Sequence, residues 1–176
     1  MTNVDPNSDA FLSRCKKLIR DVPDFPKKGI MFKDIAPLIG SDLFPELVQF
    51  MADQVRDTEP TAIAGIESRG FILGSAIAHE MNCGFVPVRK KGKLPPPVVS
   101  HSYSLEYGED TIEVQPGRGG IVLIDDVLAT GGTMTAAATA LTKAGYEVLD
   151  ILVLIDLKAL NSFAFQDIKA KSVLAL

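Results

Sequence analysis

Residues 121–133, IVLIDDVLATGGT, decide how the rest of the chain is interpreted. The first four residues are apolar and favour β-structure without polar alternation, which predicts a central strand of a parallel sheet covered on both faces. Two adjacent carboxylates, Asp125 and Asp126, follow this strand directly. Residues 130–133, Thr-Gly-Gly-Thr, favour a tight turn, and the segment after them contains enough Ala, Leu and Met to form a helix. The stretch therefore predicts a strand, a polar turn and a helix amino terminus in direct succession.

A turn at a helix amino terminus suits an anion. Backbone N–H groups point outward there, the helix dipole adds positive potential, and the hydroxyls of Thr130, Thr133 and Thr135 add donors, which together fit a phosphate monoester. Carboxylates accept hydrogen bonds but do not donate them, so Asp125 and Asp126 can hold the two hydroxyls of a ribose whose 5-phosphate occupies the turn. The alternative is an ordinary strand–loop–helix corner with a capping Thr and surface acids. The sequence contains neither a P-loop nor the three-glycine dinucleotide fingerprint.

The same stretch resembles the phosphoribosyl diphosphate motif of the type I phosphoribosyltransferases, in the version of the members that act on adenine. The resemblance rests on the apolar strand, the Asp-Asp pair and the Ala-Thr-Gly-Gly-Thr turn. It implies that Asp125 and Asp126 bind the ribose. It also implies a 5-phosphate site made of consecutive turn residues, namely Ala129, Thr130, Gly131, Gly132 and Thr133.

Two further segments resemble the diphosphate-binding loops of this family. Residues 64–71, AGIESRGF, start within the strand expected at 61–66 and continue into the loop after it, and residues 89–93 contain four cations in five positions. Taken alone, a loop Arg is usually solvated or paired with a surface acid, and a basic run is usually a solvated face. The resemblance instead assigns five residues of these segments to the diphosphate, namely Ser68, Arg69, Arg89, Lys90 and Lys93.

A proline-broken, apolar segment at about residues 20–40 is expected to form a hood over a flat ligand, with an aromatic ring available for stacking. The alternative is a loop that plugs the end of the core. The segment resembles the purine-binding hood of the adenine-specific members, in which the positions of Met31, Phe32 and Lys33 contact or flank adenine. Lys33 stands where many members carry Arg, so it retains the charge and lacks the planar fork.

The segment from about residue 94 to residue 116 (94–116) is expected to form a flap that closes over the substrate. Alternating polar and apolar residues predict two strands, at 102–107 and 111–115, joined through 108–110. The segment SYSLEYG resembles the family's catalytic loop, which implies that Glu106 handles a proton and that Tyr103 and Tyr107 belong to the flap.

The composition predicts one soluble, cytoplasmic domain. The chain has 176 residues, of which 47% are hydrophobic, and its net charge of −4 gives no general reason to expect nucleic acid or an anionic membrane as a partner. The amino terminus does not resemble a signal peptide, and the apolar runs are too short to cross a bilayer. Cys15 and Cys83 lack metal-ligand spacing and are expected to be buried, reduced thiols.

Strands alternating with helices predict an α/β fold with an open, mostly parallel, doubly wound sheet. Further helices are expected at 8–20 and 42–57, and a weak helix and short strand after 157. The resemblance covers about residues 20–157 and implies transfer of a phosphoribosyl group from 5-phospho-α-D-ribose 1-diphosphate to adenine. It also implies a homodimer and Mg²⁺ held mainly by substrate and water. The alternatives are a transferase for hypoxanthine, guanine or xanthine, and a non-enzymatic regulator that senses the ribose diphosphate.

Overall fold

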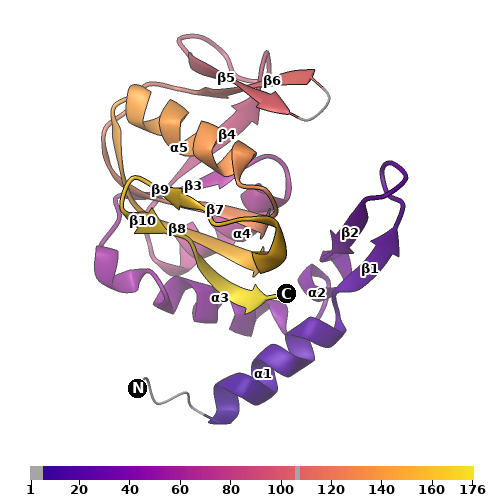
Figure 1. Cartoon of the computed structure of the whole chain (residues 1–176). Coiled ribbons are helices and arrows are strands. Elements are labelled where there is room, and N and C mark those ends of the chain that lie inside the picture. The colour runs from indigo at the N-terminus through magenta and orange to yellow at the C-terminus, as the bar shows by residue number, and fades with distance from the viewer. Residues whose placement is uncertain (1–5, 106–107) are drawn as a thin grey trace. The chain divides into compact units, whose positions relative to one another are not determined.

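A computed structural model describes residues 6–105 and 108–176 of the chain (Figure 1). The chain forms two compact units, Met1–Gln49 and Phe50–Leu176. The single domain expected from the length stays a prediction. In the described part of the chain, no helix combines the length and the apolar character that crossing a membrane requires.

The first unit contains a helix and a small antiparallel hairpin. Helix α1 buries Phe11 and Cys15, which are four residues apart and therefore share one helix face. Strands β1 and β2 pair with Val22 opposite Phe32, so the proline-broken hood contains a regular hairpin. The elements of this unit are α1 (Pro6–Lys17), β1 (Arg20–Pro23), β2 (Met31–Asp34) and α2 (Ala36–Ile39), and α3 (Phe44–Asp53) crosses the boundary between the units.

The second unit is built on a sheet with the strand order β11-β8-β7-β3-β4-β6-β5. The strands from β11 to β4 are parallel, and β6 and β5 continue the sheet as an antiparallel hairpin. The α/β class and the mostly parallel sheet are therefore confirmed. The remaining elements are β3 (Ala62–Ile66), α4 (Arg69–Glu80), β4 (Gly84–Lys90), β5 (Val99–Leu105), β6 (Gly108–Val114), β7 (Gly119–Leu128), α5 (Gly132–Lys143), β8 (Tyr146–Asp156), β9 (Ala164–Phe165), β10 (Ile168–Lys169) and β11 (Lys171–Ala175).

Helices α4 and α5 cover opposite faces of this sheet (Figure 1). Ala64 of β3 lies in the apolar cluster that also contains the buried side of α5. The neighbouring position, Gly65, faces α4, where a Cβ on Gly65 would lie 2.5 Å from the carbonyl oxygen of Gly70. Because side chains alternate along a strand, the two helices must cover different faces. This arrangement explains why the central strands are apolar without alternation.

Several predicted boundaries are wrong. The helix expected at 42–57 ends at Asp53, because backbone bonds of the i to i−3 type tighten its end into a short 3₁₀ turn at Arg56–Thr58. Strand β7 runs on to Leu128, since the long strand β8 continues to supply backbone partners as far as Asp156. Residues 108–110, expected to join the two hairpin strands, belong to strand β6, and residues 106–107 lie outside the described residues.

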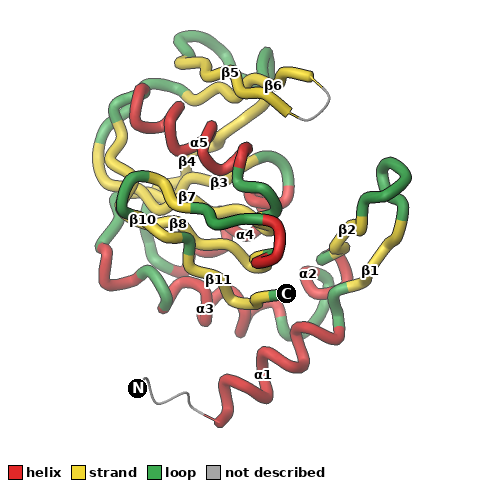
Figure 2. Tube along the Cα trace, viewed as in Figure 1, coloured by secondary structure: helices red, strands yellow, loops and turns green. Residues whose placement is uncertain are grey.

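The tail after residue 157 also differs from the expected weak helix. It contains one 3₁₀ turn, Lys158–Leu160, then the short β9–β10 pair, and ends in β11 (Figure 2). Strand β11 pairs in parallel with β8. Its backbone covers what would otherwise be an exposed edge of the sheet, and the apolar Val173 and Leu174 become buried.

Candidate active site

A cleft of about 340 Å³ opens at the carboxyl ends of the parallel strands of the second unit. Strand β3 pairs with β7 only as far as Ile124, so the next part of β7 has an open side. Asp125 and Asp126 lie at that point, as expected where parallel strands end beside a crevice. The cleft brings together most of the predicted ribose, phosphate, diphosphate and flap residues, namely Ser68, Arg69, Arg89, Lys90, Tyr103, Asp125, Asp126, Ala129, Thr130, Gly131, Gly132 and Thr133.

Other predicted site residues do not line this cleft. Lys93 is exposed and contributes a backbone contact only, described below. Met31, Phe32 and Lys33 belong to the first unit. Glu106 and Tyr107 lie outside the described residues.

The turn before α5 is a backbone site. Gly131 has a positive φ of 87° and precedes the first residue of the helix, Gly132. This conformation is one that glycine adopts readily, and it turns the first N–H groups of the helix outward. Within the described residues no side chain caps α5, so a capping Thr does not explain the turn. The hydroxyl of Thr133 lies 3.3 Å from the hydroxyl of Tyr103, which connects the hairpin to the start of the helix.

The two aspartates are held in the wall of the cleft and are not surface acids. Asp126 is only 4% exposed, and its Oδ2 forms an ion pair with Nε of Arg69 at 2.9 Å. The Asp126 N–H donates a hydrogen bond of 2.9 Å to Oδ1 of Asp125. Burial, and then the neighbouring Asp126, raise the pKa of Asp125 well above its ordinary value. Burial also raises the pKa of Asp126, although Arg69 opposes that shift. The two carboxylates are therefore well suited to accept hydrogen bonds from a ligand that donates them.

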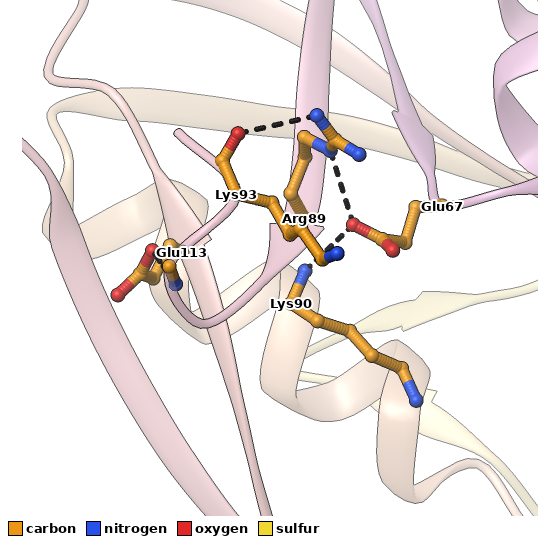
Figure 3. A network of polar contacts seen from close by, with 6 residues as sticks. Glu67, Arg89, Lys90, Lys93 and Glu113 are labelled. Carbon is orange, nitrogen blue, oxygen red and sulfur yellow. Dashed lines mark hydrogen bonds and ion pairs between the residues drawn. The ribbon is translucent and has the colours of Figure 1, made fainter. Parts of the chain in front are cut away.

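Residues at the end of β4 form a polar network around Glu67 (Figure 3). Oε2 of Glu67 accepts hydrogen bonds from Nε of Arg89 at 3.1 Å and from the backbone N–H of Lys90 at 2.9 Å. Nη1 of Arg89 donates to the carbonyl oxygen of Lys93 at 3.1 Å. The Lys90 ammonium lies 3.2 Å from Oδ2 of Asp110. Arg89 and Lys90 are thus part of an organised network, not a loose solvated face.

Two polar residues of this site were missed by reasoning from the sequence. Glu67 and Asp110 line the cleft and pair with its cations. Glu67 stands directly before the predicted diphosphate ligands, and that position was the only signal available for it. Asp110 lies in a polar hairpin, where nothing distinguishes it from an ordinary solvated acid.

In the hood hairpin, the rings of Phe25 and Phe32 meet edge to face with centroids 5.0 Å apart. Met31 is half exposed. The Lys33 ammonium donates to Oδ1 of Asp21 at 2.7 Å, so its charge is neutralised within the hairpin. The hairpin therefore presents an apolar, aromatic surface of the kind that suits a flat ring.

The described residues contain no group of three or more His, Cys, Asp and Glu side chains arranged to hold a metal ion. Two carboxylates, Asp125 and Asp126, do line the cleft. Mg²⁺ prefers oxygen ligands and keeps several of its waters, so a pair of carboxylates beside a phosphate-bearing ligand fits it without a protein cage.

Comparison with known proteins agrees with this geometry. The family model of the phosphoribosyl transferase domain matches residues 42–172. The adenine phosphoribosyltransferase of Bdellovibrio bacteriovorus is 48% identical over 159 residues, covering 90% of this chain and 96% of the relative. The crystal structure of the Rhodothermus marinus enzyme superposes with a TM-score of 0.85 at 42% identity, covering 96% of this chain and 99% of that one.

A third similar structure carries ligands. The adenine phosphoribosyltransferase of Saccharomyces cerevisiae, complexed with adenine and an imino-altritol bisphosphate, has a TM-score of 0.84 at 28% identity. It covers 94% of this chain and 99% of its own. The chain therefore belongs to the phosphoribosyltransferase family, and within it to the adenine phosphoribosyltransferases.

Proposed function

We propose that this protein transfers the 5-phosphoribosyl group from 5-phospho-α-D-ribose 1-diphosphate to adenine, giving AMP and diphosphate. One observation carries the proposal. A glycine turn at a helix amino terminus, two adjacent carboxylates and three cations surround one cleft of about 340 Å³. These groups match a phosphate, a pair of sugar hydroxyls and a diphosphate in that order.

The sugar phosphate occupies the β7–α5 turn. Residues 129–133 receive the 5-phosphate through backbone N–H groups and the hydroxyls of Thr130 and Thr133. Asp125 and Asp126 accept hydrogen bonds from the two ribose hydroxyls, and their raised pKa values make such donors favourable. Thr135 is exposed and does not line the cleft, so it has no part in this site.

The diphosphate is the leaving group and takes the cation-rich side of the cleft. Breaking the bond between C1 and oxygen leaves an oxocarbenium-like sugar and a departing polyanion, so fixed positive charge lowers the barrier. Arg69, Arg89 and Lys90 supply that charge, with Ser68 and Lys93 as further ligands. Arg69 lies against Asp126 in the described structure, and it exchanges this partner for phosphate oxygens when the ligand binds.

Adenine is bound by Met31, Phe32 and Lys33, with Phe32 stacking on the purine. The likeness to the yeast enzyme complexed with adenine supports this choice of base over hypoxanthine, guanine or xanthine. N9 forms the new bond to C1 and its proton must leave, and Glu106 takes that proton or orients the base. Tyr103 and Tyr107 belong to the flap that excludes water.

Substrate oxygens and water would hold Mg²⁺ on the ribose diphosphate, and the described residues of the protein would supply no cage for it. When bound, Mg²⁺ would neutralise charge on the diphosphate.

The protein acts as a homodimer, as the family resemblance implies, and analytical ultracentrifugation tests this. It works in the cytoplasm, where its free thiols Cys15 and Cys83 stay reduced; burial raises the pKa of Cys15 to about 11, which keeps that thiol unreactive.

Diphosphate release tests the activity. Purified protein with Mg²⁺ and the ribose diphosphate is supplied with adenine, hypoxanthine, guanine or xanthine in turn. Nucleotide should form efficiently with adenine alone. Equal or greater rates with another base would make the protein a different transferase, and binding without turnover for every base would make it a sensor.

A further inference from the structure

The C-terminal tail backs the turn that lines the cleft. A Cβ placed on Gly131 would lie 2.8 Å from Cδ2 of Phe163, so the phenyl ring is in close contact with this glycine. Phe163 is partly buried against the apolar cluster that includes Met134 of the first helical turn. The ring therefore packs directly against the turn at Gly131 and against the apolar cluster beneath α5.

A short polar chain holds Phe163 in place. The backbone N–H of Phe163 donates to Oδ1 of Asn161 at 3.1 Å. Nδ2 of Asn161 donates to Oδ1 of Asp156 at 3.1 Å and to the carbonyl oxygen of Leu157 at 3.2 Å. Asp156 is 1% exposed at the end of β8 and forms an ion pair with Lys158. A residue that is fixed by the sheet itself thus sets the position of the ring.

Phe163 also borders a hollow outside the cleft. This hollow, of about 280 Å³, is lined by Phe163, Asn161, Asp156 and Leu128 among others. Leu128 also lines the cleft, and its carbonyl oxygen accepts a hydrogen bond of 2.9 Å from the N–H of Leu157. The turn therefore contacts Phe163, and Phe163 is bordered by a hollow, so the position of the turn depends on how that ring is held.

We propose that Phe163 is a positioning residue for the 5-phosphate turn and that Asn161 and Asp156 fix its place. The inference rests on the proposed assignment of residues 129–133 to the 5-phosphate. Phe163 does not contact the ligand. It holds the peptide groups around Gly131 in the orientation that phosphate oxygens require, because a shift of a fraction of an ångström weakens several hydrogen bonds together.

Calorimetry with two separate probes tests this role. Ribose 5-phosphate reports on the turn, and diphosphate alone reports on the cation-rich side. Phe163→Ala should weaken ribose 5-phosphate by about tenfold, because the turn loses its support, and should change diphosphate by less than about twofold. Phe163→Leu should recover most of the affinity. Phe165→Ala is the matched control, since Phe165 packs against the same cluster from β9 and should leave both affinities unchanged.

Unchanged ribose 5-phosphate affinity in Phe163→Ala overturns the proposal, and so does an equal loss for both probes. If Phe163→Ala does not unfold cooperatively, Asn161→Ala decides, with an expected loss of about threefold for ribose 5-phosphate alone. An unchanged affinity there also overturns it. Failure of the underlying assignment is separate: Gly131→Ala would then leave ribose 5-phosphate binding of the protein intact.

Discussion

The two sides of the cleft present positive potential in different ways. The side proposed for the 5-phosphate, residues 129–133, is called the phosphate side; it presents backbone N–H groups at the start of α5 and contains no charged side chain. The cation side, made of Ser68, Arg69, Arg89 and Lys90, uses full charges, each of which already has a carboxylate partner. One side is fixed by backbone geometry, and the other is held by ion pairs that a ligand must replace.

This difference has a functional meaning for a reaction that keeps one phosphate and releases two. The 5-phosphate remains on the sugar throughout, so a rigid neutral cradle serves it. The diphosphate must be bound, stabilised as it leaves and then released, and charges with alternative partners such as Asp126 and Glu67 return to those partners afterwards. Substitutions can test each half of this contrast.

The largest effect is expected where the two sides meet. Asp125→Asn combined with Asp126→Asn keeps the shape but removes the negative charge beside the developing oxocarbenium ion, so the rate should fall by about 1,000-fold. Asp150→Asn is the control, because Asp150 is also buried in the sheet but pairs with Lys171 and does not line the cleft. Steady-state rates decide. An unperturbed double variant would make these acids structural.

A substitution in the hairpin tests whether the chemical step can be slowed without weakening ligand binding at either anion site. Glu106→Gln should lower the single-turnover rate by about 100-fold, since proton handling is lost. Affinity for the ribose diphosphate should change by no more than a few fold. Glu109→Gln, an exposed neighbour on the same hairpin, should change neither value. Rates within twofold of the parent for Glu106→Gln would leave the flap as a lid alone.

The rigidity of the phosphate side can be tested with two glycines. Gly131 and Gly92 both have positive φ, at 87° and 77°, so an alanine strains the backbone at either position. At Gly131 it also meets Phe163, whereas at Gly92 it meets open space. Gly131→Ala should weaken ribose 5-phosphate by about 30-fold, and Gly92→Ala should not weaken it. Similar losses for both variants would show that general strain is responsible.

The same contrast explains which parts of the site could be predicted from the sequence. The phosphate side is local: an apolar strand, a glycine turn and helix-forming residues are adjacent in the chain, so their geometry follows from neighbouring letters. The parallel sheet and the edge that carries Asp125 followed from the same periodicity. The resemblance to a known family supplied the base and the reaction, which no local pattern contains.

The cation side depends on contacts between residues that are far apart in the chain, which local sequence patterns do not predict. Glu67, directly after β3, pairs with Arg89 of β4, although the two are separated by 22 positions in the chain. The short strand expected in the tail is present as β11, but the weak helix expected before it is wrong, because this segment forms a 3₁₀ turn and the β9–β10 pair instead. Propensity is weak where tertiary pairing decides the conformation. The contact of Phe163 with Gly131 likewise joins segments that sequence spacing does not connect.

The buried carboxylates should make the ligand-free protein less stable as pH rises. Asp125 has a raised pKa in the folded state, so the folded state binds its proton more tightly than the unfolded state does. Stability is therefore lost as pH rises above about 4, the unfolded value, through the folded pKa. Asp125→Asn removes that loss and should raise the free energy of unfolding by about 1 kcal/mol at pH 8, with a smaller gain at pH 5.

Denaturant titrations at pH 5 and pH 8 measure the free energy of unfolding of each variant. Asp150→Asn should lower this free energy, because it leaves Lys171 without its buried partner. A destabilised Asp125→Asn at pH 8 would show that Asp125 is stabilised as a carboxylate in the free protein.

The smallest effect is expected from a single, partly buried acid on the cation side. Asp110 pairs with Lys90, whose side chain is 60% exposed, so the pair is worth little to stability. Asp110 nevertheless adds negative charge to a cleft that receives a polyanion. Asp110→Asn should therefore raise diphosphate affinity by about twofold at low salt, and the gain should vanish near 1 M salt, where screening is nearly complete.

Asp53→Asn is the control for this prediction. It also breaks an exposed pair, with Arg56, but Asp53 does not line the cleft, so diphosphate binding should not change. Calorimetry at both salt concentrations provides the measurement. A loss of affinity in Asp110→Asn would mean that Asp110 positions Lys90 for the ligand, and then the cation side, like the phosphate side, would be preorganised.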